Sequence, residues 1–253
     1  MAVLLTAPAS TGTSGYTLMI ADDAEQIAAA QRLRHDVFAT ELGARLPSAV
    51  EGRDIDEFDP YCDHLIVRDE ATGAVVGTYR MMSPTAAARA GRRYGDSEFD
   101  LSRLSPLRDH LVETGRSCVH PDHRSGAVVN LMWAGIARYL HLKNLRWLGG
   151  CASVPLDDGG RLAAGVWARV SARHMSPPAL RVAPRRPWLS EETPAGDPRT
   201  ALPPLLRGYL RLGSWVCGEP AYDPDFQVAD FYVLLSMDRI DPRYRRHFLG
   251  ATR

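Results

Sequence analysis

Apolar positions in the first third of the 253-residue chain follow strand spacing, then helical spacing, then strand spacing again. The run YTLMI predicts a strand. Asp22 or Asp23 then caps a helix to about Leu42, whose apolar residues recur near helical intervals. These residues are Ile27, Ala30, Leu33, Val37 and Phe38. The segment HLIVRDEATGAVVGTYRMM predicts a hairpin that turns at Ala71–Gly73.

The remainder of the chain continues this alternation. LVETGRSCVH predicts a strand, followed by a helix that starts near Ser125. RWLGGCASV predicts another strand, followed by a helix over 158–174. A short helix in LPPLLRGYLRL, a strand pair in GSWVCGEPAY and ADFYVLLSM, and a C-terminal helix capped at Asp241 complete the pattern. The pattern is typical of an α/β fold with a mixed sheet.

Domain organisation follows from what lies between these elements. Residues 1–14 are small and polar after the first five, so we expect a disordered N-terminal tail. No interior linker interrupts the pattern, so we expect residues 15–253 to form a single domain. The proline-rich tract PRRPWLSEETPAGDP predicts a mobile excursion of the kind that borders a site.

Composition narrows the function classes. Acidic and basic residues balance at 30 each, which argues against a nucleic-acid partner. Twenty-nine of the basic residues are arginines, and the single lysine is Lys143. Lys143 lies in the segment LKNL, and no glycine-rich loop precedes it, which excludes a P-loop NTPase. Because Lys143 is predicted to lie at the end of a helix, it is also a poor candidate for a Schiff-base lysine.

Location is inferred from features the sequence lacks. We find no signal peptide and no apolar run near the ~20 residues of a membrane span. The four cysteines, without CxxC spacing, suggest reduced thiols in a cytoplasmic protein.

A strand that turns into a helix at PDHRSG is an anion-binding arrangement. The amides of Ser125, Gly126 and Ala127 are predicted to point outward, where the helix dipole favours a phosphate. A strand–turn–helix with no ligand remains the alternative, because one glycine in such a turn is common.

Two sets of charged residues are candidates for chemistry. Glu113 and Arg116 lie three apart, on opposite faces of a regular strand, and either serve a reaction cleft or form a buried ion-pair network. The loop from 41 to 63 is acidic and suits a cation or a cationic substrate, although it lacks the glycine of an EF-hand loop. A solvated loop without a role is the alternative. Its four aspartates are Asp54, Asp56, Asp59 and Asp63.

We expect no metal site. Cys62 and His64, like Cys118 and His120, are alternate residues of a strand and face opposite ways, and neither pair has zinc-knuckle spacing. A Cys–His nucleophile stays open as a minor alternative.

Taken in order, these segments resemble the ornithine N-acyltransferases of the GNAT superfamily, which make lyso-ornithine lipid from an acyl carrier protein thioester. The segments are RHDVFATELG, DIDEFDPYCDHLIV, GAVVGTYRMM, ETGRSCVHPDHRSG, GCASVP and LPPLLRGYLRLG. The related acyl-homoserine-lactone synthases share four spaced motifs with this chain. Here those motifs fall at Arg34/Val37/Phe38, Asp56/Asp59, Gly77/Arg80 and Glu113/Arg116.

The resemblance implies a GNAT fold, a mixed central sheet flanked by helices and splayed between its fourth and fifth strands. The pantetheine arm of the donor would lie in that split, between Leu111–His120 and Arg146–Val154. The phosphate loop HRSGAV departs from the Q/R-x-x-G-x-G/A of acetyl-CoA enzymes, which favours the single phosphate of acyl carrier protein over CoA. We therefore expect no tightly bound cofactor, with acyl-phosphopantetheine as donor substrate and acyl-CoA as the alternative.

Residue roles follow from this implied chemistry. The acceptor amine must lose a proton before it attacks a thioester, and Glu113 is our first choice of base. Asp56 and Asp59 would help it or hold the acceptor's ammonium group. The oxyanion needs preorganised donors, most simply amides beside Val119.

Four arginines and one aromatic residue complete the implied site. Arg34, Arg80 and Arg116 would brace the acidic loop and, with Phe38, line the substrate site. Arg124 would meet the phosphate or the carrier protein.

Other functions stay open at this stage. The acceptor is ornithine, another amino acid or S-adenosylmethionine, and an acetyl-CoA-dependent acetyltransferase is a further alternative. A non-enzymatic module that binds carrier protein or lipid is disfavoured by the intact Glu113, Asp56 and Asp59. A lipid product suggests peripheral membrane contact, for which Leu205, Leu206, Tyr209 and Leu210 are candidates, although core packing suits them better.

Overall fold

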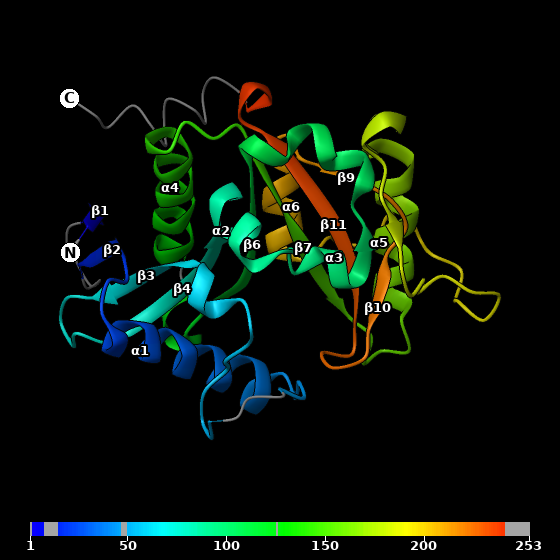
Figure 1. The fold of residues 1–253 in the computed structure, drawn as a ribbon. Helices are drawn as coiled ribbons and strands as arrows, with labels where there is room; N and C mark the ends of the chain where they lie inside the picture. The colour runs from blue at the N-terminus through cyan, green and yellow to red at the C-terminus, as the bar shows by residue number, and fades with distance from the viewer. Residues whose placement is uncertain (1, 8–14, 47–49, 125, 241–253) are drawn as a thin grey trace. The chain divides into compact units, whose positions relative to one another are not determined.

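The computed structural model describes residues 2–7, 15–46, 50–124 and 126–240. Within this part, the chain forms two compact units (Figure 1). Unit 1 contains residues up to 89 together with 114–145. Unit 2 contains residues 90–113 and 146–240. Strand β6 (Leu111–Val119) begins in unit 2 and ends in unit 1.

Unit 1 is built on a sheet in the order β1-β2-β3-β4-β6. Pairing is antiparallel from β1 to β4. The strands are β1 (Ala2–Ala7), β2 (Tyr16–Ile20), β3 (Asp63–Asp69), β4 (Val75–Met82) and the Thr114–Val119 part of β6. Short elements of this unit are a π-helical turn η1 (Asp36–Glu41) and the 3-10 turns η2 (Asp59–Tyr61) and η4 (Pro121–His123).

Helices α1 (Ala24–His35) and α4 (Ala127–Leu142) cover opposite faces of this sheet, as Figure 1 shows. Alternating strand residues divide between the two helices. Met19 packs with Ala30 of α1, whereas the preceding Leu18 lies against Gly135 of α4. Asp23 caps α1 by accepting the Gln26 amide at 2.8 Å, as its place before the apolar pattern predicts.

Unit 2 is built around β11 (Val228–Ser236), which pairs antiparallel with β7 (Trp147–Pro155) over nine residues. Strands β10 (Ala221–Asp223) and β9 (Trp215–Val216) also pair with β11. The Leu111–Glu113 part of β6 runs parallel to β7, with Glu113 opposite Gly149. Strands β5 (Phe99–Asp100) and β8 (Ala183–Pro184) form a separate pair.

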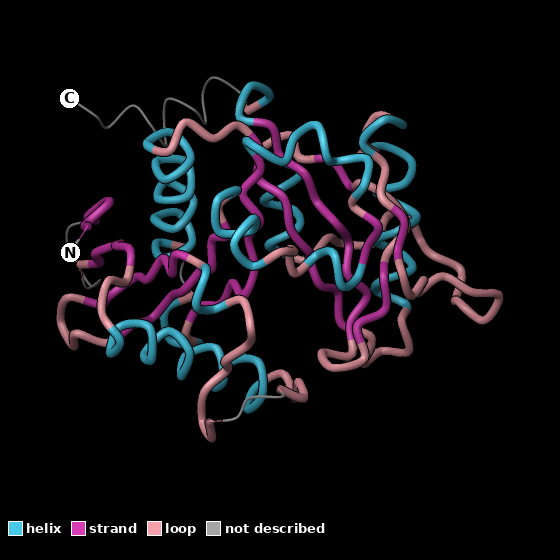
Figure 2. The backbone as a smooth tube through the Cα atoms, viewed as in Figure 1, coloured by secondary structure: helices cyan, strands magenta, loops and turns pink. Residues whose placement is uncertain are grey.

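Short helices and 3-10 turns complete unit 2. These are α3 (Gly95–Glu98), η3 (Ser102–His110), α5 (Arg161–Arg173), η5 (Pro178–Leu180), α6 (Pro204–Arg211) and η6 (Met237–Arg239). Helix α2 (Pro84–Ala90) lies where the chain leaves unit 1. Between β8 and α6 the chain runs as a long loop (Figure 2). Most of the proline-rich tract PRRPWLSEETPAGDP lies in this segment. One face of unit 2 packs Phe99 and Leu104 against Leu111, Tyr232 and Leu234.

The structure differs from the sequence prediction at the N-terminus. Ala2–Ala7 is a strand paired with β2, so the predicted disordered tail is wrong for these residues. The run AVLLTA pairs antiparallel with β2 at the sheet edge, with a register shift between Val3 and Leu5. The single domain over 15–253 stays a prediction; the described chain forms two compact units that are joined without a separate linker. The C-terminal helix capped at Asp241 lies outside the described residues.

The apolar side of α6 belongs to the core. Leu206, Tyr209 and Leu210 are buried, and only Leu205 is exposed. The core interpretation of these four residues is therefore confirmed for three of them, and a membrane-facing role for all four is wrong.

Candidate functional site

A buried ion-pair cluster in unit 1 joins three of the predicted arginines to three aspartates of the acidic loop. We call it the Arg/Asp cluster. Its members are Arg34, Arg80, Arg116, Asp54, Asp56 and Asp59. Arg34 of α1 is fully buried. Its Nη1 donates to Asp59 Oδ1 at 3.0 Å and its Nη2 donates to Asp59 Oδ2 at 2.7 Å. Its Nε lies 2.8 Å from Asp54 Oδ2, and its Nη2 also donates to the Asp54 carbonyl. This bidentate geometry requires a guanidinium.

The other two arginines reach the same loop from the sheet. Arg80 of β4 donates to Asp56 Oδ1 at 2.5 Å and to Asp59 Oδ1 at 2.9 Å. Arg116 of β6 donates to Asp54 Oδ2 at 3.0 Å and lies 3.3 Å from Asp56 Oδ2. Three positive and three negative charges therefore balance, and the predicted bracing of the acidic loop by these arginines is confirmed.

Local sequence folds the loop into the shape that the cluster needs. Asp56 Oδ1 accepts the amides of Phe58 and Asp59, a turn typical of aspartate. The Asp59 carbonyl contacts His64 Nε2 at 3.2 Å, and burial lowers the pKa of His64. Gln31 of α1 donates to Asp59 Oδ2 at 3.1 Å.

Burial and the arginines act against each other on the two aspartates. Burial alone would raise the pKa of Asp59, yet hydrogen bonds and charge from Arg34 and Arg80 hold that pKa well below its usual range. The pKa of Asp56 is likewise lowered, by Arg80 and Arg116 against the effect of burial. A carboxylate with a low pKa is a weak proton acceptor near neutral pH. Their chemistry therefore suits fixed negative charge better than proton abstraction.

Phe38 lies in η1, where α1 widens into a π-helical turn. It is half-buried and packs beside Leu33, Val37 and Cys118. Such turns are frequent at functional sites because they re-aim side chains. The spacing of Arg34 and Phe38 in the sequence therefore corresponds to one continuous helix that changes its winding between them.

Arg116 departs from regular strand geometry. Its φ is +52°, a left-handed conformation that costs about 1–2 kcal/mol in a residue with a side chain. The expectation of opposite faces for Glu113 and Arg116 assumed a regular strand, so it does not hold through this residue. The ion pairs with Asp54 and Asp56 help to hold the unusual backbone.

In the predicted phosphate loop, the side chain of Arg124 is already paired within the protein. Arg124 is exposed and forms a bidentate pair with Glu41 at 2.7 Å, and that hydrogen bond lowers the pKa of Glu41. Its Nε donates to the Val119 carbonyl at 3.0 Å. Gly126, with φ +95°, precedes Ala127, the first residue of α4. Ser125 lies outside the described residues.

One amide beside Val119 is already used. The His120 amide donates to the Val76 carbonyl at 2.8 Å. This neighbour of Val119 is thus part of the backbone hydrogen bonding and is a poor candidate for an oxyanion donor.

Glu113 lies in unit 2 and is 5% exposed. Its two carboxylate oxygens accept the amides of Tyr94 at 2.7 Å and Gly95 at 2.9 Å. Burial raises the pKa of Glu113 to about 7, although these amides and Arg93 act in the other direction. A carboxyl with a pKa near the working pH is suited to general acid–base catalysis.

Sequence reasoning missed three titratable residues on the same face of unit 2. Glu98, Asp230 and Cys151 place one potential metal-ligating atom each within 4.8 Å of one another. Burial, with Asp230 as a hydrogen-bonded neighbour, raises the pKa of Glu98 far above that of an ordinary carboxyl, so the pair holds a proton at neutral pH. They come from α3, β7 and β11, and no spacing along the chain signals that meeting.

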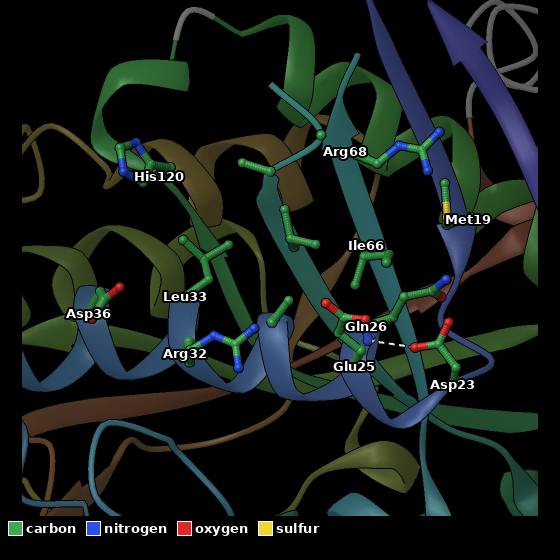
Figure 3. Close-up of a pocket in the computed structure, with 14 residues that line it drawn as sticks. Met19, Asp23, Glu25, Gln26, Arg32, Leu33, Asp36, Ile66, Arg68 and His120 are labelled. Carbon is green, nitrogen blue, oxygen red and sulfur yellow. Dashed lines mark hydrogen bonds between the residues drawn. The ribbon is translucent and has the colours of Figure 1, made fainter. Parts of the chain in front are cut away.

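A hollow of about 510 Å³ lies beside α1 in unit 1 (Figure 3). Met19, Leu33 and Ile66 give it apolar surface, and Arg32 and Arg68 are among its charged residues. Its lining contains none of the residues predicted for the site.

Comparison with known proteins identifies the family. The acetyltransferase (GNAT) domain family model matches residues 33–134. An L-ornithine N(alpha)-acyltransferase of Rhodobacter capsulatus is 38% identical over 248 residues, which cover 92% of this chain and 94% of that protein. This chain belongs to that acyltransferase family. The Brucella abortus member is 36% identical and covers 90% of this chain and 87% of its own length.

Solved structures confirm the predicted GNAT fold at low sequence identity. The AHL synthase LasI is 13% identical, with a TM-score of 0.53 over 94% of this chain and 96% of its own. FeeM, an N-acyl amino acid synthase from uncultured soil microbes, is 10% identical, with a TM-score of 0.55 over 90% of this chain and 94% of its own. In the described residues, no helix has the length and apolarity needed to cross a membrane.

Proposed function

We propose that this acyltransferase moves a 3-hydroxyacyl or related fatty acyl group from acyl carrier protein to the α-amino group of ornithine, which yields lyso-ornithine lipid. The observation that carries the proposal is the 38% identity to an L-ornithine N(alpha)-acyltransferase over nearly the full length of both chains. Two features of the structure support the proposal. The buried carboxyl of Glu113 and the Arg/Asp cluster both lie at positions of the acyltransferase motifs.

Glu113 is the proposed general base. The acceptor ammonium gives its proton to the Glu113 carboxylate, directly or through water, and the neutral amine attacks the thioester carbon. The tetrahedral intermediate then collapses: the carbon–sulfur bond breaks, the attacking nitrogen loses its second proton, and that proton passes, directly or through water, to the departing phosphopantetheine thiolate, which leaves as the thiol. The proton held by Glu113 returns to solvent. No covalent acyl-enzyme is needed, so we assign Cys118 and Cys151 no nucleophilic role. Burial raises the pKa of both thiols, which keeps them unreactive.

The Arg/Asp cluster is assigned to the acceptor end of the reaction. Asp56 is the more accessible aspartate, with 18% of its side chain exposed against 4% for Asp59. We propose that Asp56 presents charge to an ammonium group of the acceptor and that Asp59 fixes the loop. Arg34, Arg80 and Arg116 act by holding these carboxylates, and Phe38 supplies apolar surface nearby.

The phosphate of the donor is assigned to the loop before α4. Ser125, Gly126 and Ala127 are the proposed amide donors, and Val119, whose carbonyl accepts from Arg124 Nε, is proposed to belong to the same donor site. Arg124 would exchange its pair with Glu41 for the phosphate or for an acidic surface of the carrier protein. The single phosphate of a carrier-protein arm needs fewer donors than the pyrophosphate of CoA, so we favour acyl carrier protein over acyl-CoA. The donor is a substrate, and no tightly bound cofactor is proposed.

The proposal is tested with purified protein, 3-hydroxyacyl carrier protein and a panel of acceptors. The panel contains ornithine, lysine, glutamine and S-adenosylmethionine, and thiol release is measured for each. We expect turnover with ornithine to exceed that with the other acceptors. Turnover only with S-adenosylmethionine would favour the homoserine-lactone type of reaction, for which the fold likeness to LasI is the motivating observation. Turnover only with acetyl-CoA would overturn the proposal.

We further propose a cytoplasmic protein that contacts the inner membrane face peripherally, because an acylated amino acid leaves water for a bilayer. Sedimentation with vesicles in the presence and absence of product tests this point. Protein that stays in the supernatant under both conditions would contradict it.

A further inference from the structure

The hydroxyl of Tyr232 is a buried polar group without a recorded partner. Tyr232 lies on β11 in unit 2 and is 0% exposed. Among the residues that the structure describes, its hydroxyl oxygen has no hydrogen-bond partner. A buried hydroxyl that lacks a partner lowers stability relative to a phenylalanine of the same shape. The hydroxyl therefore calls for an explanation other than packing.

Two glycines leave room for Tyr232 beside Glu113. A Cβ on Gly149, the residue opposite Glu113, would lie 2.7 Å from the Tyr232 hydroxyl. A Cβ on Gly95 would lie 2.6 Å from Glu113 Oε1 and 3.0 Å from Tyr232 Cε2. The tyrosine ring and the carboxylate thus border the same small space next to Gly95. Larger residues at either glycine would push one of them away.

The ring of Tyr232 is held in place from another side. Phe99 packs against it edge-on, with ring centroids 5.7 Å apart. Both rings are fully buried in the core of unit 2. A ring fixed in this way can present its hydroxyl to one place with little loss of side-chain entropy.

The groups around Glu113 leave it short of donors for a charged carboxylate. Its partners are the amides of Tyr94 and Gly95, one for each oxygen. Arg93, just before α3, lowers the pKa of Glu113, whereas Asp96, within α3, raises it. Cys151 and Tyr232 are the titratable neighbours from β7 and β11. An ionised carboxylate accepts more than two hydrogen bonds. Because the Cys151 thiol already donates to Glu98, Tyr232 is the neighbour with a neutral donor still to be used.

We propose that Tyr232 is a positioning residue for Glu113: the Tyr232 hydroxyl donates to one bridging water, which in turn donates a hydrogen bond to the charged Glu113 carboxylate. The proton stays on the phenol oxygen throughout. A donor to the charged form lowers the pKa of a carboxyl, so Tyr232 offsets part of the effect of burial. This inference rests on the proposed role of Glu113 as base in one respect only, namely its effect on activity.

The test is Tyr232→Phe, with Tyr222→Phe as the matched control. Tyr222 lies on the neighbouring strand β10, and its hydroxyl accepts a hydrogen bond from Gln227. Two quantities are measured for each variant: the pKa of Glu113 by carboxyl ¹³C NMR titration, and the pH profile of kcat/KM. In Tyr232→Phe we expect the Glu113 pKa and the acidic limb to move to higher pH together. On the acidic limb this is a roughly three- to tenfold loss of kcat/KM, with the plateau at high pH retained. Tyr222→Phe should leave both quantities unchanged.

The outcomes separate the two proposals. An unchanged Glu113 pKa in Tyr232→Phe overturns the positioning role, whatever happens to activity. A raised pKa with an unchanged activity profile supports the contact with Glu113 and removes Glu113 as base. At a pH well below 7, where Glu113 is protonated, Tyr232→Phe is also expected to unfold at the same temperature as wild type or higher. A marked loss of stability at that pH would show that the hydroxyl has another structural partner and would overturn the proposal as well.

Discussion

Buried carboxyl groups of this protein have opposite protonation behaviour, and individual neighbours decide which. Asp59 meets two guanidinium groups, so its pKa falls despite burial. Among the residues that the structure describes, Glu113 accepts hydrogen bonds from two backbone amides, and burial outweighs them and raises its pKa to about 7. The sequence places both in an acidic or polar setting and does not distinguish them. Their different partners are the physical reason to assign base chemistry to Glu113 and fixed charge to Asp59.

Glu113→Gln is expected to lower turnover by about 10²-fold or more, because an amide cannot accept the proton of the acceptor. In wild type, activity should rise with pH through about 7, as the carboxyl ionises. The pH profile of kcat/KM for both proteins checks this. Turnover of the variant at the wild-type level would remove Glu113 from the base role.

The same residue predicts the pH dependence of stability. The pKa of Glu113 in the folded protein lies above its ordinary value. The stability that this raised pKa contributes is therefore fully present below about pH 4.5 and is lost as pH rises through about 7. The unfolding temperature of wild type minus that of Glu113→Gln should therefore fall between these two pH values. A difference that grows with pH would contradict the raised pKa.

Arg34→Lys tests the Arg/Asp cluster. Lysine retains the charge but cannot bind Asp59 through two nitrogens while also reaching Asp54, so we expect a loss of about 2–4 kcal/mol. Arg124→Lys is the matched control, because its pair with Glu41 is exposed and should contribute less than about 1 kcal/mol. Urea denaturation measures both. Equal effects in the two variants would contradict the importance of the buried fork.

At the scale of elements, glycines in two helices have opposite roles. A Cβ on Gly135 of α4 would lie 2.5 Å from Leu18 on β2, so this glycine permits close packing of helix on sheet. Gly208 of α6 has no such neighbour within 4 Å, although it too lies inside a helix. Helix propensity alone treats the two positions alike. Packing makes only the first one necessary.

Gly135→Ala is accordingly expected to lower the free energy of unfolding by about 1–3 kcal/mol, through displacement of Leu18. Gly208→Ala should raise it by about 0.5–1 kcal/mol, because alanine restricts the unfolded chain and favours the helix. Chemical denaturation of both variants checks the pair. A stabilising Gly135→Ala would contradict the packing of α4 against β2.

At the scale of the whole molecule, periodicity predicts the elements well where local pattern decides them. The helix after Asp23, the hairpin around Gly73 and the strand that contains Glu113 all form where the apolar spacing places them. Ala2–Ala7 was missed because a short edge strand depends on its partner β2 and leaves little signal of its own. The division into two compact units leaves no signal in the sequence, because β6 passes from one unit to the other without a linker.

For the candidate site too, residues that belong to a local motif could be predicted, whereas residues that only the fold brings together could not. The resemblance to the acyltransferase motifs identified the three arginines with Asp56 and Asp59, and the acidic composition of the loop identified Asp54. Neither could identify Tyr232, Glu98 or Asp230, because strand pairing and burial bring these residues together from distant parts of the chain. The unusual backbone at Arg116 was also invisible, since it depends on ion pairs with a distant loop.

The central claim is acyl transfer from carrier protein to the α-amine of ornithine. The most direct measurement is fragmentation mass spectrometry of the product formed from 3-hydroxyacyl carrier protein and L-ornithine by the purified protein. We predict one amide bond at the α-nitrogen, an unmodified side-chain amine and one free carrier-protein thiol for each product molecule. Acylation of the side-chain nitrogen, or no product beyond that of a reaction without the protein, would contradict the claim.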